Sequence, residues 1–77
     1  MGSVPLMTGH EFARDVAHAL GVESLSDADA NDILAMAGVA AHASERLAAP
    51  LCAYLAGRSG RSLDDARAAV ARVAGQD

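Results

Sequence analysis

The chain has 77 residues, a formal net charge of −4 and a hydrophobic fraction of 52%. This length suffices for one domain, near the lower limit for a core that folds without metals or disulfides. The single cysteine excludes an intrachain disulfide and any cysteine-based zinc site, and the acidic balance argues against nonspecific nucleic-acid binding, which needs a basic face.

The apolar content is unusual because alanine supplies 19 residues, whereas the aromatic residues are Phe12 and Tyr54 alone. Alanine buries little area, so we expect closely approaching helices with few large side chains between them. A core this small favours a partner chain or self-association. We expect residues 1–6 to be a disordered segment or a cloning remnant, and residues 7–75 to form a single helical domain.

The first helix is predicted over residues 9–20. Thr8 and Glu11 form a capping box at its start, and Gly21 follows it as the expected left-handed residue. Its apolar residues fall at four-residue steps on one face: Phe12, Val16 and Leu20.

The second helix is predicted to begin at Ser26 or Asp27, both good N-cap residues, and to run to about Arg46. Its middle, residues 35–43, is apolar on all sides, which is typical of a central helix with neighbours on several faces. We expect Gly38 to let another helix come close.

Pro50 predicts the start of a third helix, because proline interrupts a continuous helix but suits its first turn. We therefore expect a tight corner at residues 47–49. The predicted buried stripe of this helix consists of Leu51, Tyr54 and Leu55.

The segment GRSGRS at residues 57–62 is predicted to be a turn, after which Ser62 and Asp65 give a second capping signal. The fourth helix is predicted to reach Ala74, with one face formed by Leu63, Ala66, Val70 and Val73. No strand pattern is visible. The predicted fold is an all-α, compact four-helix domain with the second helix central and a Pro-started third helix.

The candidate binding residues lie at the predicted corner: His42, Arg46 and Pro50. His42 precedes Arg46 by one helical turn, and the N–H groups that open the third helix attract anions, so the three residues form a candidate phosphate, carboxylate or partner site. In the alternative interpretation, Arg46 bonds the corner carbonyls or pairs with an acidic residue and has a structural role.

Catalytic and metal chemistry are not expected. Cys52 is interpreted as a small buried cysteine rather than a nucleophile. No histidine has a second ligand three or four residues away, and the acidic run from Asp27 to Asp32 suits a helix N-terminus better than a calcium loop. The longest uncharged runs are too short to span a bilayer and no signal peptide is visible, so we expect a cytoplasmic protein that is not an enzyme and uses no cofactor.

The run AHASERLAAPLCAYLAG at residues 41–57 resembles an actinobacterial family of small domains of unknown function, whose members carry a run like AHAVERPAAPLTTFLAG. Leu47 and Cys52 depart from that pattern, which has Pro and Thr there. The agreeing positions are Ala41, His42, Glu45, Arg46, Ala48, Ala49, Pro50, Leu51, Leu55 and Gly57.

That family occurs alone or fused to nucleotidyltransferases similar to molybdenum cofactor guanylyltransferase. The resemblance therefore implies a non-enzymatic accessory or protein-interaction domain linked to molybdenum cofactor biosynthesis or molybdoenzyme maturation. The expected partner is a nucleotidyltransferase of that route, with no nucleic acid and no membrane involved. The alternative is a structural helical domain that forms a homodimer through its alanine-rich faces and binds no ligand.

Overall fold

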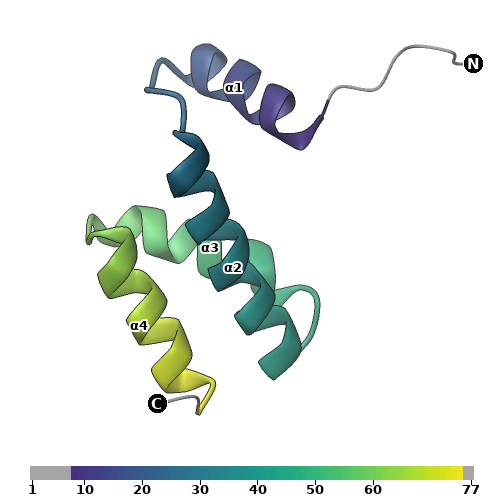
Figure 1. Cartoon of the computed structure of the whole chain (residues 1–77), viewed down its shortest axis with the longest axis vertical. Helices are drawn as coiled ribbons and strands as arrows, with labels where there is room; N and C mark the ends of the chain where they lie inside the picture. Colours follow the sequence, from purple (N-terminus) through teal and green to yellow (C-terminus); the bar gives the residue numbers. More distant parts are fainter. Residues whose placement is uncertain (1–7, 76–77) are drawn as a thin grey trace, which may run out of the picture. The chain divides into compact units, whose positions relative to one another are not determined.

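A computed structural model describes residues 8–75 and contains four α-helices in that range, with no strand (Figure 1). They are α1 (Gly9–Leu20), α2 (Asp27–Ala43), α3 (Ala48–Ser59) and α4 (Leu63–Val73). The predicted all-α class and the four-helix count are confirmed. The expectation for residues 1–6 falls outside the described residues. None of the helices between residues 8 and 75 has the length and apolar character needed to cross a membrane.

The contacts of the chain divide it inside α2, into the units Met1–Ala30 and Asn31–Asp77. The first unit holds α1 and the opening turn of α2, and the second holds the rest of α2 with α3 and α4. Each unit is described by itself. The single domain expected over residues 7–75 stays a prediction.

In the first unit, α1 has the predicted bounds and the predicted capping box. The Thr8 hydroxyl accepts from the Glu11 N–H at 3.1 Å, and the Glu11 carboxylate accepts from the Thr8 N–H at 2.9 Å. Gly21 ends the helix with φ of 73°, a left-handed conformation that glycine adopts without steric penalty. Of the apolar face, Phe12 remains 60% exposed and Leu20 70%.

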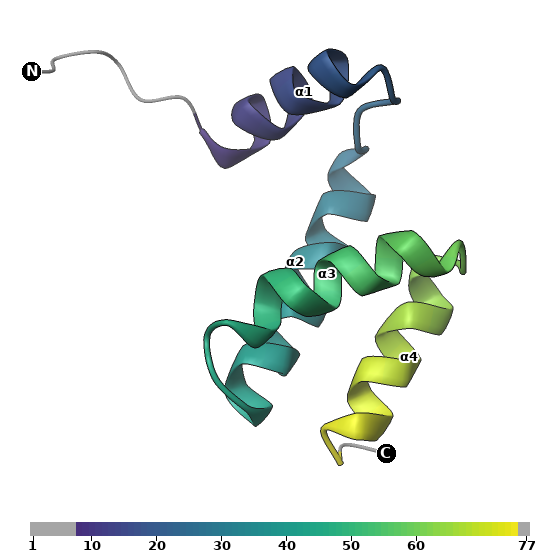
Figure 2. The same ribbon diagram turned by 180° about the vertical axis from the view of Figure 1, so that it is seen from behind.

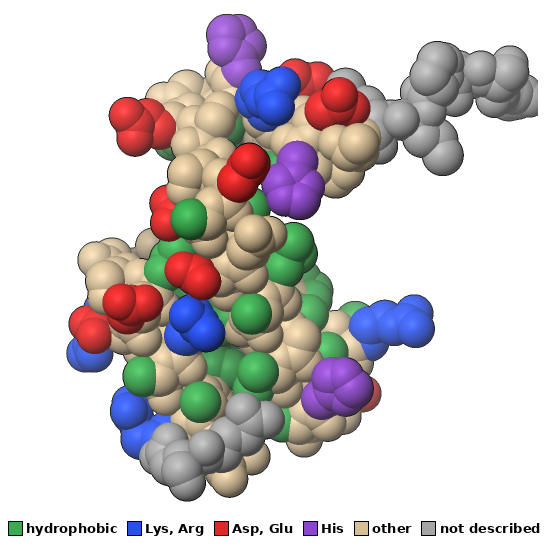
Figure 3. Space-filling model, in the orientation of Figure 1, with side chains coloured by type: hydrophobic (Ala, Val, Ile, Leu, Met, Phe, Trp, Pro, Cys, Tyr) green, Lys and Arg blue, Asp and Glu red, His purple; other side chains and the backbone are tan. Residues whose placement is uncertain are grey.

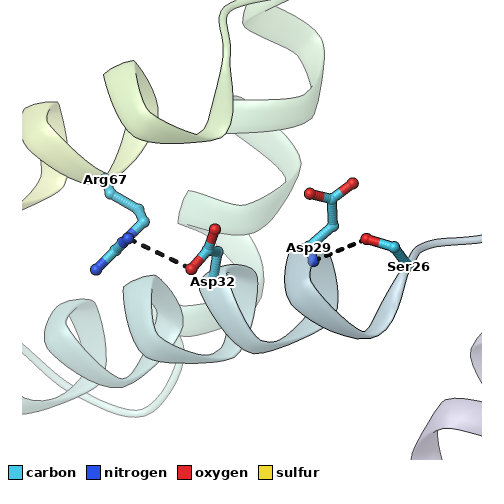
Figure 4. Close-up of polar contacts among 4 residues, drawn as sticks. All are labelled: Ser26, Asp29, Asp32 and Arg67. Atoms are coloured by element: carbon cyan, nitrogen blue, oxygen red, sulfur yellow. Dashed lines mark hydrogen bonds and ion pairs between the residues drawn. The ribbon is translucent and has the colours of Figure 1, made fainter.

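Helix α2 begins as predicted and ends early. The Ser26 hydroxyl accepts from the Asp29 N–H at 3.0 Å and so caps the helix (Figure 4). The helix ends at Ala43, three residues before the predicted end at Arg46, because the chain turns over residues 44–47. The predicted close approach at Gly38 is wrong, since a Cβ added there would meet no atom within 4 Å.

Helix α3 begins at Ala48 rather than at Pro50, which is the third residue of its first turn. The Ala48 and Ala49 N–H groups donate to the Glu45 and Arg46 carbonyls at 2.9 and 3.2 Å. Pro50 has no N–H and needs no such partner, so it fits the first turn without being its first residue.

The predicted turn at residues 57–62 is shorter than expected. Helix α3 continues through Gly57 to Ser59, and Gly60 breaks it with φ of 71°. The Ser62 hydroxyl then accepts from the Asp65 N–H at 3.1 Å, which confirms the second capping signal. Of the predicted face of α4, Ala66 is buried, but Val73 is 91% exposed.

Packing in the second unit relies on small side chains. Its buried hydrophobic residues are Met36 and Ala40 of α2 and Ala66 of α4, and α3 packs against α4 (Figure 2). Helix α3 turns inward a half-buried row made of Ala48, Ala49, Cys52, Ala53 and Ala56. Small residues let two helix backbones come close, which explains why the row, and not the large residues, faces inward.

The predicted buried stripe of α3 is therefore wrong. Leu51, Tyr54 and Leu55 are 63%, 67% and 56% exposed. The assumption that the largest apolar side chains form the core fails here because the alanine row occupies the inward face.

Candidate functional site

Four exposed residues of α3 and its N-cap share one side of the helix, which we call the α3 face: Leu47, Leu51, Tyr54 and Arg58. Their spacing of four, three and four residues keeps them on one side of the helix, as at the seam of a coiled coil. Leu47 belongs to it because its backbone already has helical angles, φ −62° and ψ −23°. The described chain leaves this seam without a partner.

Arg58 lies over the ring of Tyr54, with its guanidinium carbon 6.0 Å from the ring centroid. This distance is at the edge of a cation–π contact, and the two residues are one helical turn apart. Tyrosine and arginine are the residue types enriched where binding energy concentrates in protein interfaces.

The predicted corner residues all lie at the surface between α2 and α3. His42 is in the last turn of α2, Arg46 is in the connecting turn, and Pro50 is in the first turn of α3; each is exposed. Neither of the two cavities described below is lined by any of the three. Their role as a binding site stays a prediction.

The backbone N–H groups at this corner bear on the expected binding of an anion. The Ala48 and Ala49 N–H groups already donate to carbonyls of the turn, and Pro50 has none. An anion at the start of α3 would therefore rely on the His42 and Arg46 side chains, without the free N–H groups that a helix start usually offers. This favours the partner-contact form of the hypothesis over the phosphate pocket.

A groove of about 650 Å³ lies between α3 and α4 and reaches the end of α2. Its walls are mostly alanine and valine, with Arg61 and Arg72 as its charged residues. Cys52, which was predicted to be a small buried cysteine, lines it and is half-buried. Because no histidine lines the groove, the described geometry gives Cys52 no imidazole base there.

A second cavity, of about 400 Å³, lies between α2 and α4 and is lined by Met36, Val39 and Arg67 among others. Beside it, Arg67 donates to an Asp32 carboxylate oxygen at 3.4 Å, which links α4 to α2 (Figure 4). Both side chains are substantially exposed, so the pair is a weak structural link rather than a site. Figure 3 shows hydrophobic side chains reaching the surface of this unit among arginine and acidic side chains.

Residues 8–75 bring no three histidine, cysteine, aspartate or glutamate side chains together as metal ligands. The acidic residues that open α2 instead meet a helix N-terminus, where Asp29 is bonded through its backbone to Ser26.

Sequence reasoning missed the α3 face because it assigned Leu51 and Tyr54 to the core. The sequence did contain a signal that this side of α3 faces outward. The seam ends in Arg58, a residue that is rarely buried unpaired, whereas the alternative row along α3 contains only alanine and cysteine.

Comparison with protein families gives one result. Residues 5–76 match the model of a family described as a domain of unknown function, DUF6457. Curated proteins and solved structures were also searched, and neither search found a match.

Proposed function

The chain belongs to the DUF6457 family, and from this premise we propose that it is a non-enzymatic protein-interaction domain whose partner binds the α3 face. The observation that carries the proposal is the outward seam of Leu47, Leu51 and Tyr54, each about two-thirds exposed. Exposing these side chains in water is unfavourable, so covering them with an apolar partner surface supplies the driving force for binding.

The corner residues extend this surface. Arg46 adjoins Leu47 in the chain and is exposed, so it would lie at the rim of the interface, with His42 and Pro50 beside it. A rim charge mainly affects the association rate and its salt dependence, whereas the apolar centre supplies most of the affinity. The proposed centre is therefore Leu51 and Tyr54.

The proposed partner is a nucleotidyltransferase similar to molybdenum cofactor guanylyltransferase. Support for this choice comes from the resemblance of residues 41–57 to the family that occurs fused to such enzymes, and the same run contains Leu47, Leu51 and Tyr54 of the α3 face. In some proteins of that family the domain is fused to the nucleotidyltransferase, and in others it is a separate chain. The separate chain would then bind the same kind of enzyme noncovalently. The proposed role is to assist molybdenum cofactor biosynthesis or molybdoenzyme maturation.

The test is binding of the purified chain to purified molybdenum cofactor guanylyltransferase, measured by calorimetry. The double variant Leu51→Ala/Tyr54→Ala should weaken binding by at least about tenfold, because both anchors are lost. Its free energy of unfolding should change by no more than about 0.5 kcal/mol, since both side chains are exposed. Arg46→Ala should weaken binding less and flatten its salt dependence.

Leu34→Ala is the matched control, because Leu34 is an equally exposed leucine on α2. It should leave the affinity unchanged. If the wild-type chain does not bind the guanylyltransferase, the proposed partner is wrong. If binding occurs and the double variant retains it, the α3 face is not the contact.

A further inference from the structure

The groove between α3 and α4 opens where the two helices diverge from the turn that joins them (Figure 2). Its volume of about 650 Å³ falls within the range of cavities that hold small molecules. Alanines of its wall, such as Ala56 and Ala69, leave open the space that longer side chains would fill. None of the four residues of the α3 face lines it, so an occupant of the groove does not depend on the proposed function.

The wall of the groove offers an occupant mainly apolar contact. Its described residues include no aromatic side chain, so a flat ring such as a nucleobase finds no stacking partner there. The Ser59 hydroxyl is already bonded, since it donates to the Ala56 carbonyl at 2.7 Å and accepts from the Arg61 N–H at 3.1 Å. An aliphatic chain, which needs no hydrogen bond, therefore matches this wall.

A protein segment matches the groove less well. A peptide in extended form would bury backbone N–H and C=O groups against aliphatic side chains that cannot bond them. A helix of about 10 Å diameter and the length of α4 has a volume of about 1300 Å³, which is twice that of the groove. These volumes favour a small aliphatic molecule.

Both charged residues of the groove are arginines, Arg61 and Arg72. Neither forms an ion pair within the described chain, where the one such pair joins Asp32 and Arg67. No acidic residue of that part of the chain lines the groove, and Asp64, in the first turn of α4, lines the cavity between α2 and α4 instead. The charge of the groove thus favours an occupant that carries an anionic group.

The two arginines lie near opposite ends of α4, and the helix dipole distinguishes them. Arg61 directly precedes the N-cap Ser62, and the N–H end of a helix favours an anion. Arg72 is in the last turn, where the carbonyl end disfavours an anion and already stabilises the arginine charge. Since an arginine can hold a carboxylate through two N–H groups at once, a carboxylate fits best at Arg61.

We propose that the groove binds an aliphatic carboxylate of the fatty-acid class, with the carboxylate at Arg61 and the chain along the α3–α4 wall. The chain runs past Cys52 and Val70 toward the end of α2, where Ala43 lines the groove. Its burial against alanine and valine supplies the affinity, and the arginine fixes its direction.

The probe is decanoate, added to the full chain below its micelle-forming concentration, with its Kd measured by calorimetry. Cys52 gives a reading confined to the groove, because it is the single cysteine and lines the wall. At about ten times its Kd, decanoate should slow the alkylation of Cys52 by iodoacetamide about tenfold, since the bound chain shields the thiol. At the same concentration, 1-decanol, which lacks the charge, and butanoate, which lacks the chain, should slow it by no more than about twofold.

Arg61→Gln should raise the Kd of decanoate at least about tenfold, because the charge-assisted bonds to the carboxylate are lost. The matched control is Arg58→Gln, which makes the same charge change on the α3 face and should alter the Kd by less than about twofold. The inference is overturned if decanoate leaves the alkylation rate unchanged, an outcome that points to a protein segment as the occupant. It is also overturned if 1-decanol protects Cys52 as well as decanoate does, or if Arg61→Gln binds decanoate as tightly as the wild-type chain.

Discussion

Helices α2 and α3 have similar apolar compositions, yet they use their large side chains in opposite ways. Helix α2 buries Met36 to 2% exposure, with Ala40 one turn further on. Helix α3 has no buried residue and carries Leu51 and Tyr54 on its outer side. The core of the second unit thus depends on one long flexible side chain and several alanines.

The difference between α2 and α3 shows that the apolar content of a helix does not predict which of its faces is inward. In α3 the half-buried row of alanine and cysteine lies on the inner side of the helix, where Ala48, Cys52 and Ala56 line the groove that α3 forms with α4. The large residues are then left outside, where they are available for a partner. One helix thus contributes to the fold with one side and to the proposed interface with the other.

The largest effect expected from this comparison is at Met36. Met36→Ala should lower the free energy of unfolding by about 2–4 kcal/mol, because it leaves a cavity in a core with few large side chains. Urea denaturation followed by circular dichroism measures this loss. Leu34→Ala, in the same helix but with Leu34 exposed, should cost less than about 1 kcal/mol. Equal losses for the two variants would contradict the division between the inner and outer sides of α2.

An intermediate effect, of opposite sign, is expected at Gly38. Gly38→Ala should raise the free energy of unfolding by about 0.5–1 kcal/mol, because alanine favours helix and the added methyl group meets no neighbour. Gly57→Ala in α3 should give a smaller gain, since Gly57 lies near the end of its helix at Ser59. Thermal unfolding of both variants provides the comparison. A loss of stability in Gly38→Ala would show that another element packs against α2 at that point.

The smallest effect is expected for the link between α2 and α4. Asp32→Asn should lower the free energy of unfolding by at most about 0.5 kcal/mol, because the pair with Arg67 is long and exposed. A double-mutant cycle with Arg67→Gln, measured at low and high salt, isolates the coupling. Its disappearance at high salt is expected, and a coupling that persists there would mean that the pair is shielded from solvent.

Local signals in the sequence predicted the helix starts well. Thr8 with Glu11, Ser26, and Ser62 with Asp65 each form the hydrogen bond that their spacing indicates. The α2–α3 boundary was predicted less well. Pro50 marked the presence of a break, but the break lies over residues 44–47, because proline tolerates any position in the first helical turn.

The sequence by itself determined the class of fold, the number of helices and most of their ends, because capping and turn formation depend on residues within a few positions of each other. Only the tertiary structure decided which side of α3 faces inward, and hence that Leu51 and Tyr54 form a surface rather than a core. That choice depends on how closely α3 and α4 can approach, which is a property of two helices together and is not encoded in the periodicity of either one.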